Sequence, residues 1–282
     1  MKLWKIVLLC TAVVAAGAAG RVALGIHQTE AEIAAHRAEV ARIGAAHPAP
    51  APDPAQIAAL PAPVQRYLRF AVPGPVPRGA VVHLAAKGQF RRPQTDSFAA
   101  TTAEQVIATG TPALMFSATT PIGPLWARAY DFYAEGRMAM KAKIVSTLVV
   151  VDERETPELD RISLRRWLLE SALYPQALLP GGPVTWEPID DSYARAVVRQ
   201  GAMTAAMVAE FDAEGRMVAM QAEEDGDLTT PWHGSGEHVT RGDYRAVEGV
   251  MIPHRFTISR AAGGRVFPFW SGEITAIRFA PD

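Results

Sequence analysis

Apolar and polar positions alternate along most of the chain after residue 80. Val82, Leu84 and Ala86 alternate with a second set that includes lysine and glutamine, and this two-residue period is typical of a strand with one wet face. The same reasoning predicts further strands at residues 98–107, 113–119, 126–133, 137–151, 184–186, 192–199, 204–211, 216–222, 237–245, 251–260 and 266–279. Hairpins separate most of these segments, so the pattern predicts an antiparallel sheet.

Two segments have a helical period instead. Pro63 can occupy the first turn of a short helix that runs to Phe70. Between Pro157 and Pro180 a longer helix is predicted, and it separates the two groups of strands. Its apolar stripe consists of Leu159, Ile162, Leu169, Leu173 and Ala177. The order of elements therefore predicts an α+β fold in which the sheet packs on one amphipathic helix.

Residues 1–26 have the pattern of a signal peptide or membrane anchor. Lys2 and Lys5 precede an apolar run that Arg21 ends, as in an export signal. The run alone is shorter than the roughly 20 residues that span a bilayer, but its apolar flanks can lengthen it into an anchor if Arg21 reaches the interface.

Cleavage and retention of this segment both have support in the sequence. Small residues at 18–20 suit a signal peptidase. Ile26, Ile33 and Val40 recur at sevenfold spacing, which indicates that the helix continues as a polar helix over residues 27–46. We favour an uncleaved anchor on this basis.

The location follows from the charges beside the apolar segment. Positive residues remain in the cytoplasm, so Lys2 and Lys5 predict an inner-membrane-anchored or exported protein whose remainder is extracytoplasmic, in the periplasm. Residues 47–56 alternate proline with small residues and predict a stiff linker. It would hold one globular domain, residues 57–282, roughly 20 Å beyond the preceding helix.

Composition narrows the possible functions. The formal net charge of -1 gives no support for nucleic-acid binding. Cys10 is the only cysteine and lies in the apolar leader, so the domain can form neither a disulfide nor a thiolate metal cluster. Glycine-rich phosphate loops, paired-histidine metal helices and calcium loops are absent from the sequence. The sequence therefore predicts no cofactor and no metal.

Histidines and carboxylates near residue 235 are the main candidates for enzyme chemistry. His233, Glu237 and His238, joined by His254 from another strand, could offer ligands for zinc. Their spacing matches no known metal motif, and a turn leading into a strand, which we favour, explains the segment without any metal. His254 falls in register with apolar positions, either as a core residue or as a polar group in a ligand cavity.

Glu170 stands among apolar residues of the long predicted helix, with Arg166 one turn earlier. An exposed ion pair on the helix surface is the favoured interpretation. A buried carboxylate is the alternative and would supply a polar anchor or an acid. The methionines of the later strands either line a cavity or fill a solid core, and these are Met203, Met207, Met217 and Met220.

Several segments resemble one uncharacterised bacterial family, which is known only as a domain of unknown function. The segments that carry the resemblance are residues 60–68, 164–180, 186–196 and 230–232. The resemblance extends from about Leu60 to the C-terminus, and His233 departs from it. More loosely, the order of elements is similar to the lipoprotein-carrier fold. That similarity implies a large curved antiparallel sheet, a half-barrel, around an apolar pocket closed by helices.

These observations lead to three functional hypotheses. The first is a membrane-tethered extracytoplasmic protein that binds a lipid or other apolar molecule against the central helix. Its candidate ligand-binding residues are Trp167, Glu170, Tyr174, Trp186, Trp232 and His254. The second is an envelope hydrolase that uses Glu170, His233, Glu237 or His254, and the third is a noncatalytic envelope scaffold. An apolar cavity would favour the first, converging histidines and carboxylates the second, and a solid core with an exposed apolar patch the third.

Overall fold

The computed structural model describes residues 2–76, 79–91, 95–154, 156–226 and 236–280. Within them, 13 antiparallel strands form one sheet in the order β6-β5-β4-β3-β2-β1-β13-β12-β11-β10-β9-β8-β7. The strands are β1 (Val81–Arg91), β2 (Phe98–Ala108), β3 (Leu114–Ile122), β4 (Leu125–Ala134), β5 (Arg137–Ile144), β6 (Leu148–Arg154), β7 (Val184–Pro188), β8 (Tyr193–Gln200), β9 (Met203–Phe211), β10 (Met217–Gln221), β11 (His238–Val247), β12 (Val250–Ala262) and β13 (Arg265–Ala280).

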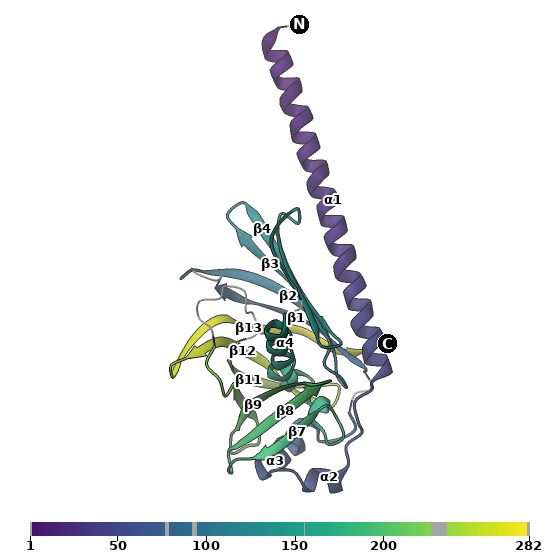
Figure 1. Ribbon diagram of the computed structural model, residues 1–282, viewed down its shortest axis with the longest axis vertical. Coiled ribbons are helices and arrows are strands. Elements are labelled where there is room, and N and C mark those ends of the chain that lie inside the picture. The colour runs from purple at the N-terminus through teal and green to yellow at the C-terminus, as the bar shows by residue number, and fades with distance from the viewer. Residues whose placement is uncertain (1, 77–78, 92–94, 155, 227–235, 281–282) are drawn as a thin grey trace.

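The sheet is strongly curved and wraps around α4 (Pro157–Glu170), as Figure 1 shows. Almost every strand pairs with its neighbour in sequence, whereas β1 pairs with both β2 and β13. The first and last strands therefore join two groups of hairpins into a single half-barrel. The predicted α+β fold, with a large curved antiparallel sheet on one amphipathic helix and an apolar N-terminal helix, is confirmed.

Two glycines allow β1 and β13 to approach closely where the sheet bends. Gly88 and Gly272 face each other across this pair. A Cβ on Gly272 would lie 2.3 Å from the Lys87 carbonyl oxygen, and one on Gly88 would lie 2.1 Å from the Ser271 carbonyl oxygen. Glycine in a strand commonly marks such a close approach of backbones.

The strand predicted over residues 137–151 is two strands, β5 and β6. The turn between them places Val145 and Ser146 at positive φ (46° and 57°). This turn could not be predicted, because valine at positive φ is unusual and the apolar pattern continues through it. Two nearly identical turn sequences, at residues 134–138 and 213–217, form the hairpins β4–β5 and β9–β10.

The predicted long helix is an α-helix only in its first part. The Thr156 hydroxyl caps α4 by accepting a hydrogen bond from the Leu159 amide at 3.1 Å, and Pro157 begins the helix. The α-helix ends at Glu170 and continues as two 3-10 turns, η1 (Ser171–Leu173) and η2 (Pro175–Leu178). Pro175 has no amide hydrogen and disfavours a helical Tyr174, which explains the break.

The N-terminal helix α1 (Leu3–Ala46) is continuous and lies against the outer face of the sheet (Figure 1). Ile33 and Val40 are fully covered there, in a second core cluster with residues of β1 to β4, while Ile26 remains partly exposed. The predicted separation of helix and domain by a stiff spacer is therefore wrong. The prolines end the helix, but the helix itself packs on the domain.

Two short helices follow the proline-rich segment. α2 (Pro54–Ala58) begins inside the segment predicted as linker, because the Asp53 carboxylate caps it by accepting from the Ala55 amide at 2.9 Å. α3 (Ala62–Ala71) matches the short helix expected from Pro63 and buries Tyr67 and Leu68. It closes one end of the half-barrel against β12 and β9.

The inner face of the half-barrel holds the main hydrophobic core. α4, η1 and η2 fill it with side chains that are fully buried, including Trp167 and Tyr174. Met207, Met217 and Met220 are also buried in this cluster and contribute to a packed core.

Candidate functional site

Three of the predicted site residues meet inside the half-barrel. Trp167 and Tyr174 have no exposed surface and Glu170 is 4% exposed. The Trp167 and Tyr174 rings lie 5.3 Å apart, and the Tyr174 hydroxyl donates to the Trp167 carbonyl. The Trp167 indole donates to the Ala108 carbonyl at 3.1 Å. The indole N–H of Trp167 and the hydroxyl of Tyr174 therefore both bind the protein's own backbone.

Glu170 belongs to a buried ion-pair network, so the favoured interpretation as an exposed pair is wrong. Arg166 Nε donates to Glu170 Oε1 at 3.1 Å, and its Nη1 donates to Asp131 Oδ2 at 2.6 Å. The side-chain amide of Gln105 donates to the same Glu170 oxygen at 3.2 Å. The Arg166 guanidinium also lies over the Phe116 ring, 4.6 Å from its centroid. The network joins α4 to β2, β3 and β4.

Burial and pairing act in opposite directions on these charges. Burial raises the pKa of the Asp131 carboxyl above its usual range, in spite of Arg166 beside it. Burial also lowers the pKa of Arg166, but Glu170 and Asp131 outweigh it and the net shift is upward. Arg166 therefore remains charged in the folded protein and holds the two carboxyl groups in place.

A second buried pair fixes the other side of α4. Arg165 Nη2 donates to Glu237 Oε1 at 2.9 Å, and the Ala261 amide donates to Glu237 Oε2 at 3.1 Å. Arg241 Nη2 donates to the Leu169 carbonyl at 3.2 Å. Six buried charged side chains thus lie on α4 and around it, three basic and three acidic. A balanced and enclosed network of this kind positions the helix and offers no exposed acid or base.

The other predicted residues do not join this network by any hydrogen bond in the described part of the chain. The His254 ring is hydrogen bonded to the Ile252 carbonyl of its own strand at 3.0 Å. Trp186 donates to the Leu178 carbonyl at 3.3 Å, and its ring lies 6.0 Å from that of Phe211. Trp232 and His233 lie outside the described residues. Across the described ranges, no group of three His, Cys, Asp or Glu side chains is arranged to hold a metal ion.

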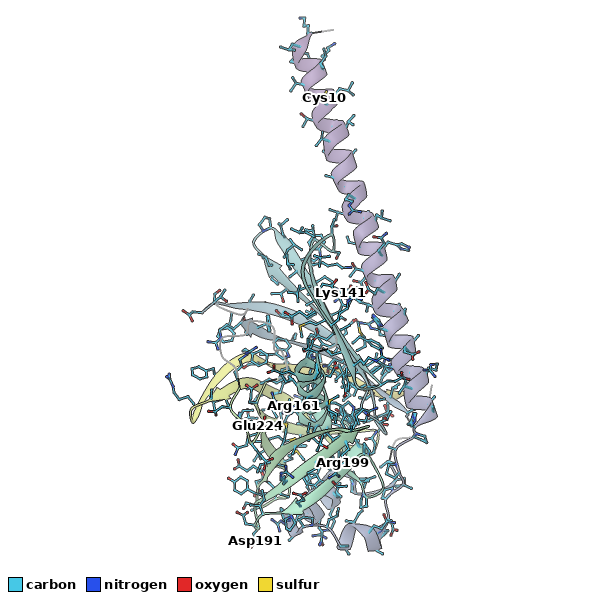
Figure 2. The ribbon with its side chains drawn as sticks, in the orientation of Figure 1. Cys10, Lys141, Arg161, Asp191, Arg199 and Glu224 are labelled. Atoms are coloured by element: carbon cyan, nitrogen blue, oxygen red, sulfur yellow. The ribbon has the colours of Figure 1, made fainter. Side chains whose placement is uncertain are left out.

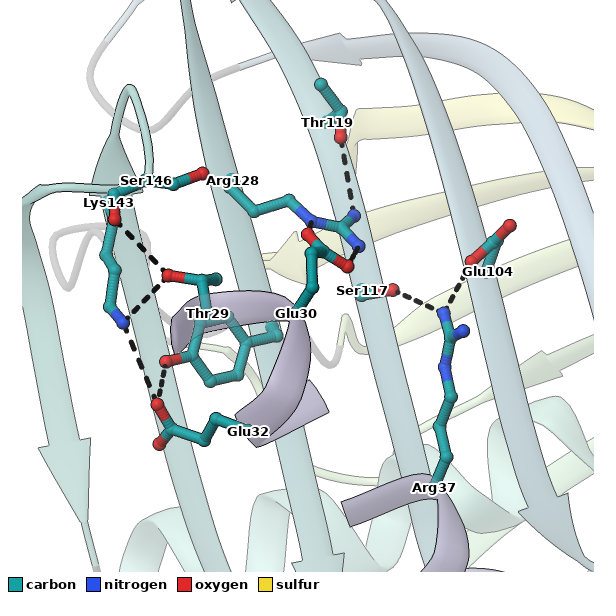
Figure 3. Close-up of polar contacts among 11 residues, drawn as sticks. Thr29, Glu30, Glu32, Arg37, Glu104, Ser117, Thr119, Arg128, Lys143 and Ser146 are labelled. Carbon is teal, nitrogen blue, oxygen red and sulfur yellow. Dashed lines mark hydrogen bonds and ion pairs between the residues drawn. The ribbon is translucent and has the colours of Figure 1, made fainter. Parts of the chain in front are cut away.

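A different polar site lies on the outer face of the sheet, where α1 docks (Figure 3). Glu30 forms a bidentate ion pair with Arg128, with Nε–Oε1 and Nη2–Oε2 distances of 2.8 and 3.0 Å. Arg37 pairs with Glu104 and donates to the Ser117 hydroxyl at 3.1 Å. Bidentate pairing of this kind fixes both distance and orientation. These pairs set how α1 lies on the sheet.

Glu32 contributes a further link from α1 to the sheet. It accepts hydrogen bonds from the Tyr130 hydroxyl at 2.7 Å and from Lys141, and Lys143 lies 3.7 Å away. Burial opposes the charge of Glu32, but the bonds from Lys141 and Tyr130 outweigh burial and lower its pKa. Docking of α1 is therefore coupled to the ionisation of Glu32.

This coupling predicts a pH dependence for docking. Because the folded-state pKa lies below the unfolded value, the contribution of Glu32 is complete above the unfolded pKa and is lost as pH falls through the folded pKa. We expect the difference in unfolding free energy between wild type and Glu32→Gln to shrink between about pH 5 and pH 3. Denaturant titrations of both proteins in detergent at several pH values measure it. A pH-independent difference would contradict the coupling.

A hollow of about 580 Å³ lies beside the docked helix, and we call it the outer trough. Its floor consists of small side chains on the outer face of β1, β2 and β3. Ile26 and Glu30 of α1 form one wall. The lining residues are Ile26, Glu30, Ala85, Ala86, Lys87, Thr102, Ala103, Glu104, Ser117, Thr119, Trp126, Arg128, Ser146 and Thr275. Figure 3 shows Glu30, Arg128, Thr119, Ser117 and Glu104 around it.

Sequence reasoning missed the outer trough. Its residues come from seven separate segments that only the sheet register and the docking of α1 bring together. One signal was present, since Thr102, Glu104, Ser117 and Thr119 occupy the wet positions of two adjacent predicted strands. The partner of that face, the polar helix with Glu30 and Arg37, could not be inferred from local pattern.

Comparisons with known proteins agree with the resemblance found in the sequence. None of the curated proteins matches this chain. Among solved structures, a LolA superfamily protein from Nitrosomonas europaea is similar at 10% identity, with a TM-score of 0.38, over 79% of this chain and 94% of that one. Residues 58–279 match the family of unknown function DUF6920, and the chain therefore belongs to that family.

Proposed function

We propose that this protein is a membrane-anchored, extracytoplasmic binding protein whose outer trough takes the polar head of a membrane amphiphile. One observation carries the proposal. A single helix, α1, supplies both an exposed apolar segment that is long enough to cross a membrane and one wall of the outer trough. The binding site is therefore attached directly to the anchor.

The length of α1 supports this arrangement. Every residue from Leu3 to Arg21 is exposed, whereas Gly25 is buried against the domain. At 1.5 Å per residue, the segment from Leu3 to Leu24 is roughly 33 Å long, which is close to the hydrocarbon thickness of a bilayer, and its charged residues Lys5 and Arg21 lie toward its two ends. Ile26 and Glu30 would then lie just outside the hydrocarbon layer, at the depth of lipid headgroups.

The chemistry of the outer trough suits an amphiphile. Thr102, Ser117 and Thr119 offer hydroxyl groups. Arg128 and Lys87 place basic groups at its edges, where they pair with Glu30 and Glu273, so that both signs of charge are present for a polar head. Ile26 and Trp126 provide apolar surface on the side from which α1 extends toward the membrane. Ligand sites commonly combine apolar walls with a few polar groups in a volume of about 300–1,000 Å³.

The interior of the half-barrel is a weaker candidate for the ligand site. Trp167, Glu170 and Tyr174 are covered and hydrogen bonded within the chain. A ligand there would have to displace packed side chains and a charge-balanced network, at a cost of several kcal/mol. The outer trough is open without any such rearrangement.

Filling the outer trough is the direct test. Thr102 is exposed on β2 and points into the trough, so Thr102→Tyr should block it and leave the strand intact. Full-length protein is extracted in mild detergent and examined by native mass spectrometry with lipid extraction. We expect a bound amphiphile on wild type and at least about tenfold lower occupancy on the variant, equivalent to about 1.4 kcal/mol.

Thr240→Tyr is the matched control, because Thr240 is also exposed on the outer face but lies on β11, away from the trough. It should keep wild-type occupancy. The proposal is overturned if wild type retains no amphiphile, or if both variants lose it equally.

A further inference from the structure

We infer that two hairpin tips beside the anchor form a second contact with the bilayer and enter its headgroup region. The contact surface, called here the hairpin-tip surface, consists of the exposed Leu125, Leu148, Val149 and Val150 and the half-buried Trp126. The inference shares the anchor with the proposed function but does not depend on the outer trough.

The hairpin-tip surface is unusually apolar for an exposed part of a sheet. Leu148 is 63% exposed, Val149 and Val150 are each 48% exposed, and Leu125 is 46% exposed. β6 is one of the two edge strands of the sheet. Exposed sheet edges are normally protected by charges, prolines or bulges, because an apolar edge promotes aggregation. An exposed cluster of this kind indicates that something apolar covers it.

The two tips lie side by side at one end of the sheet. Ala127 of β4 pairs with Ile144 of β5, and the Val145 amide donates to the Trp126 carbonyl at 2.9 Å. The β3–β4 turn and the β5–β6 turn therefore form one continuous surface.

The helix α1 leaves the domain at this same surface. A Cβ on Gly25 would lie 2.4 Å from Thr147 Oγ1 and 2.7 Å from the Ser146 carbonyl oxygen. The Thr29 hydroxyl donates to that same carbonyl at 3.3 Å. Glycine at position 25 thus lets the helix touch the β5–β6 turn directly. From that point toward the N-terminus, α1 extends alone (Figure 1).

These contacts fix the depth of the tips relative to the membrane. Arg21 lies one helical turn before Gly25, where its charge can reach the headgroups, and the residues before it are apolar. The tips touch α1 at Gly25 and so lie at that same depth. Trp126 has the amphipathic ring that is enriched at membrane interfaces. Figure 2 shows Asp191 at the other end of the domain, far from Cys10 of the anchor.

The bilayer explains the surface better than a second copy of the chain does. Pairing between two copies would use the whole length of β6, but its later residues Asp152, Glu153 and Arg154 are charged. The apolar residues are confined to the end nearest the anchor and include Leu125 from another hairpin. A membrane surface contacts such a tip, whereas an edge-to-edge partner contacts a strand.

Site-directed spin labelling of the full-length protein tests the inference. In a Cys10→Ser background, labels are placed at Leu148→Cys and, separately, at Ile189→Cys. Ile189 is 51% exposed and lies two residues from Asp191, at the opposite end. The proteins are reconstituted into phosphatidylcholine–phosphatidylglycerol vesicles. Collision rates with oxygen and with a water-soluble nickel complex then report the depth of each label.

In vesicles, we expect the oxygen-to-nickel collision ratio of the label at position 148 to be severalfold higher than that of the label at position 189, which faces water. Equal ratios at the two positions would overturn the inference, and so would strong spin–spin broadening at 148, which would indicate a second copy. A label at Val14→Cys reports the anchor. If the label at position 14 lies within the bilayer and the label at 148 faces water, the hairpin-tip contact alone is refuted. If the label at position 14 faces water, the anchor itself is refuted.

Discussion

Replacing Arg166 by methionine is expected to lower the free energy of unfolding by about 3–5 kcal/mol. The change leaves the buried carboxyl groups of Asp131 and Glu170 without their cation. Methionine fills much of the same volume, so lost packing contributes little. Urea unfolding of the full-length protein in detergent, followed by tryptophan fluorescence, measures the loss.

Arg161→Met is the matched control on the same helix. Arg161 pairs with Glu224 at 3.2 Å, but the two side chains are 39% and 69% exposed; both residues are labelled in Figure 2. Exposed pairs contribute about 0–1 kcal/mol. Equal effects of the two substitutions would contradict the view that burial makes the Arg166 network important.

The loss at Arg166 also has a definite pH dependence. Burial already raises the pKa of Asp131 with Arg166 present, and removing the cation raises it further. A folded-state pKa above the unfolded value favours the protonated carboxyl on folding. The destabilisation therefore grows as pH rises through the carboxylate range and is smaller in acid. Adding Asp131→Asn and Glu170→Gln to the variant removes both charges and should restore part of the stability at neutral pH.

The sheet was predictable because its information is local. Each strand carries its own two-residue period, and hairpins connect neighbours, so antiparallel pairing follows without knowledge of the whole chain. The pairing of β1 with β13 joins residues almost 200 positions apart, and no local pattern encodes it. The turn at Val145 was also missed, since its residues resemble a strand.

The site was less predictable than the fold. Arg166 and Glu170 could be paired from their spacing on one helix, but Asp131 and Gln105 come from other strands. The strands that carry Asp131 and Gln105 cover the Arg166–Glu170 pair and so bury it. In the same way, the sevenfold stripe of Ile33 and Val40 indicated a continuing helix but not which surface covers it. The outer trough depends on that docking and was therefore missed entirely.

Replacing Trp167 by alanine is expected to cost about 3–5 kcal/mol of unfolding free energy. Trp167 is fully buried, packs on Tyr174 and donates to the Ala108 carbonyl. The substitution leaves a cavity and an unpaired carbonyl, and the latter adds about 1 kcal/mol. Trp167→Phe retains most of the packing and should cost considerably less. Trp126→Ala, at a partly exposed ring, should cost less than about 1 kcal/mol.

The same substitution distinguishes a ligand cavity from a solid core inside the half-barrel. If Trp167 is a core residue, the alanine variant unfolds more easily but, while folded, keeps its amphiphile in the outer trough. If Trp167 lines a ligand cavity, the variant unfolds at the wild-type denaturant concentration and loses the amphiphile. Denaturant unfolding and native mass spectrometry of the same protein sample therefore distinguish a core residue from a cavity-lining one. Wild-type stability with loss of the amphiphile would place the binding site in the interior of the half-barrel. Thr102→Tyr would then have no effect on the amount of bound amphiphile.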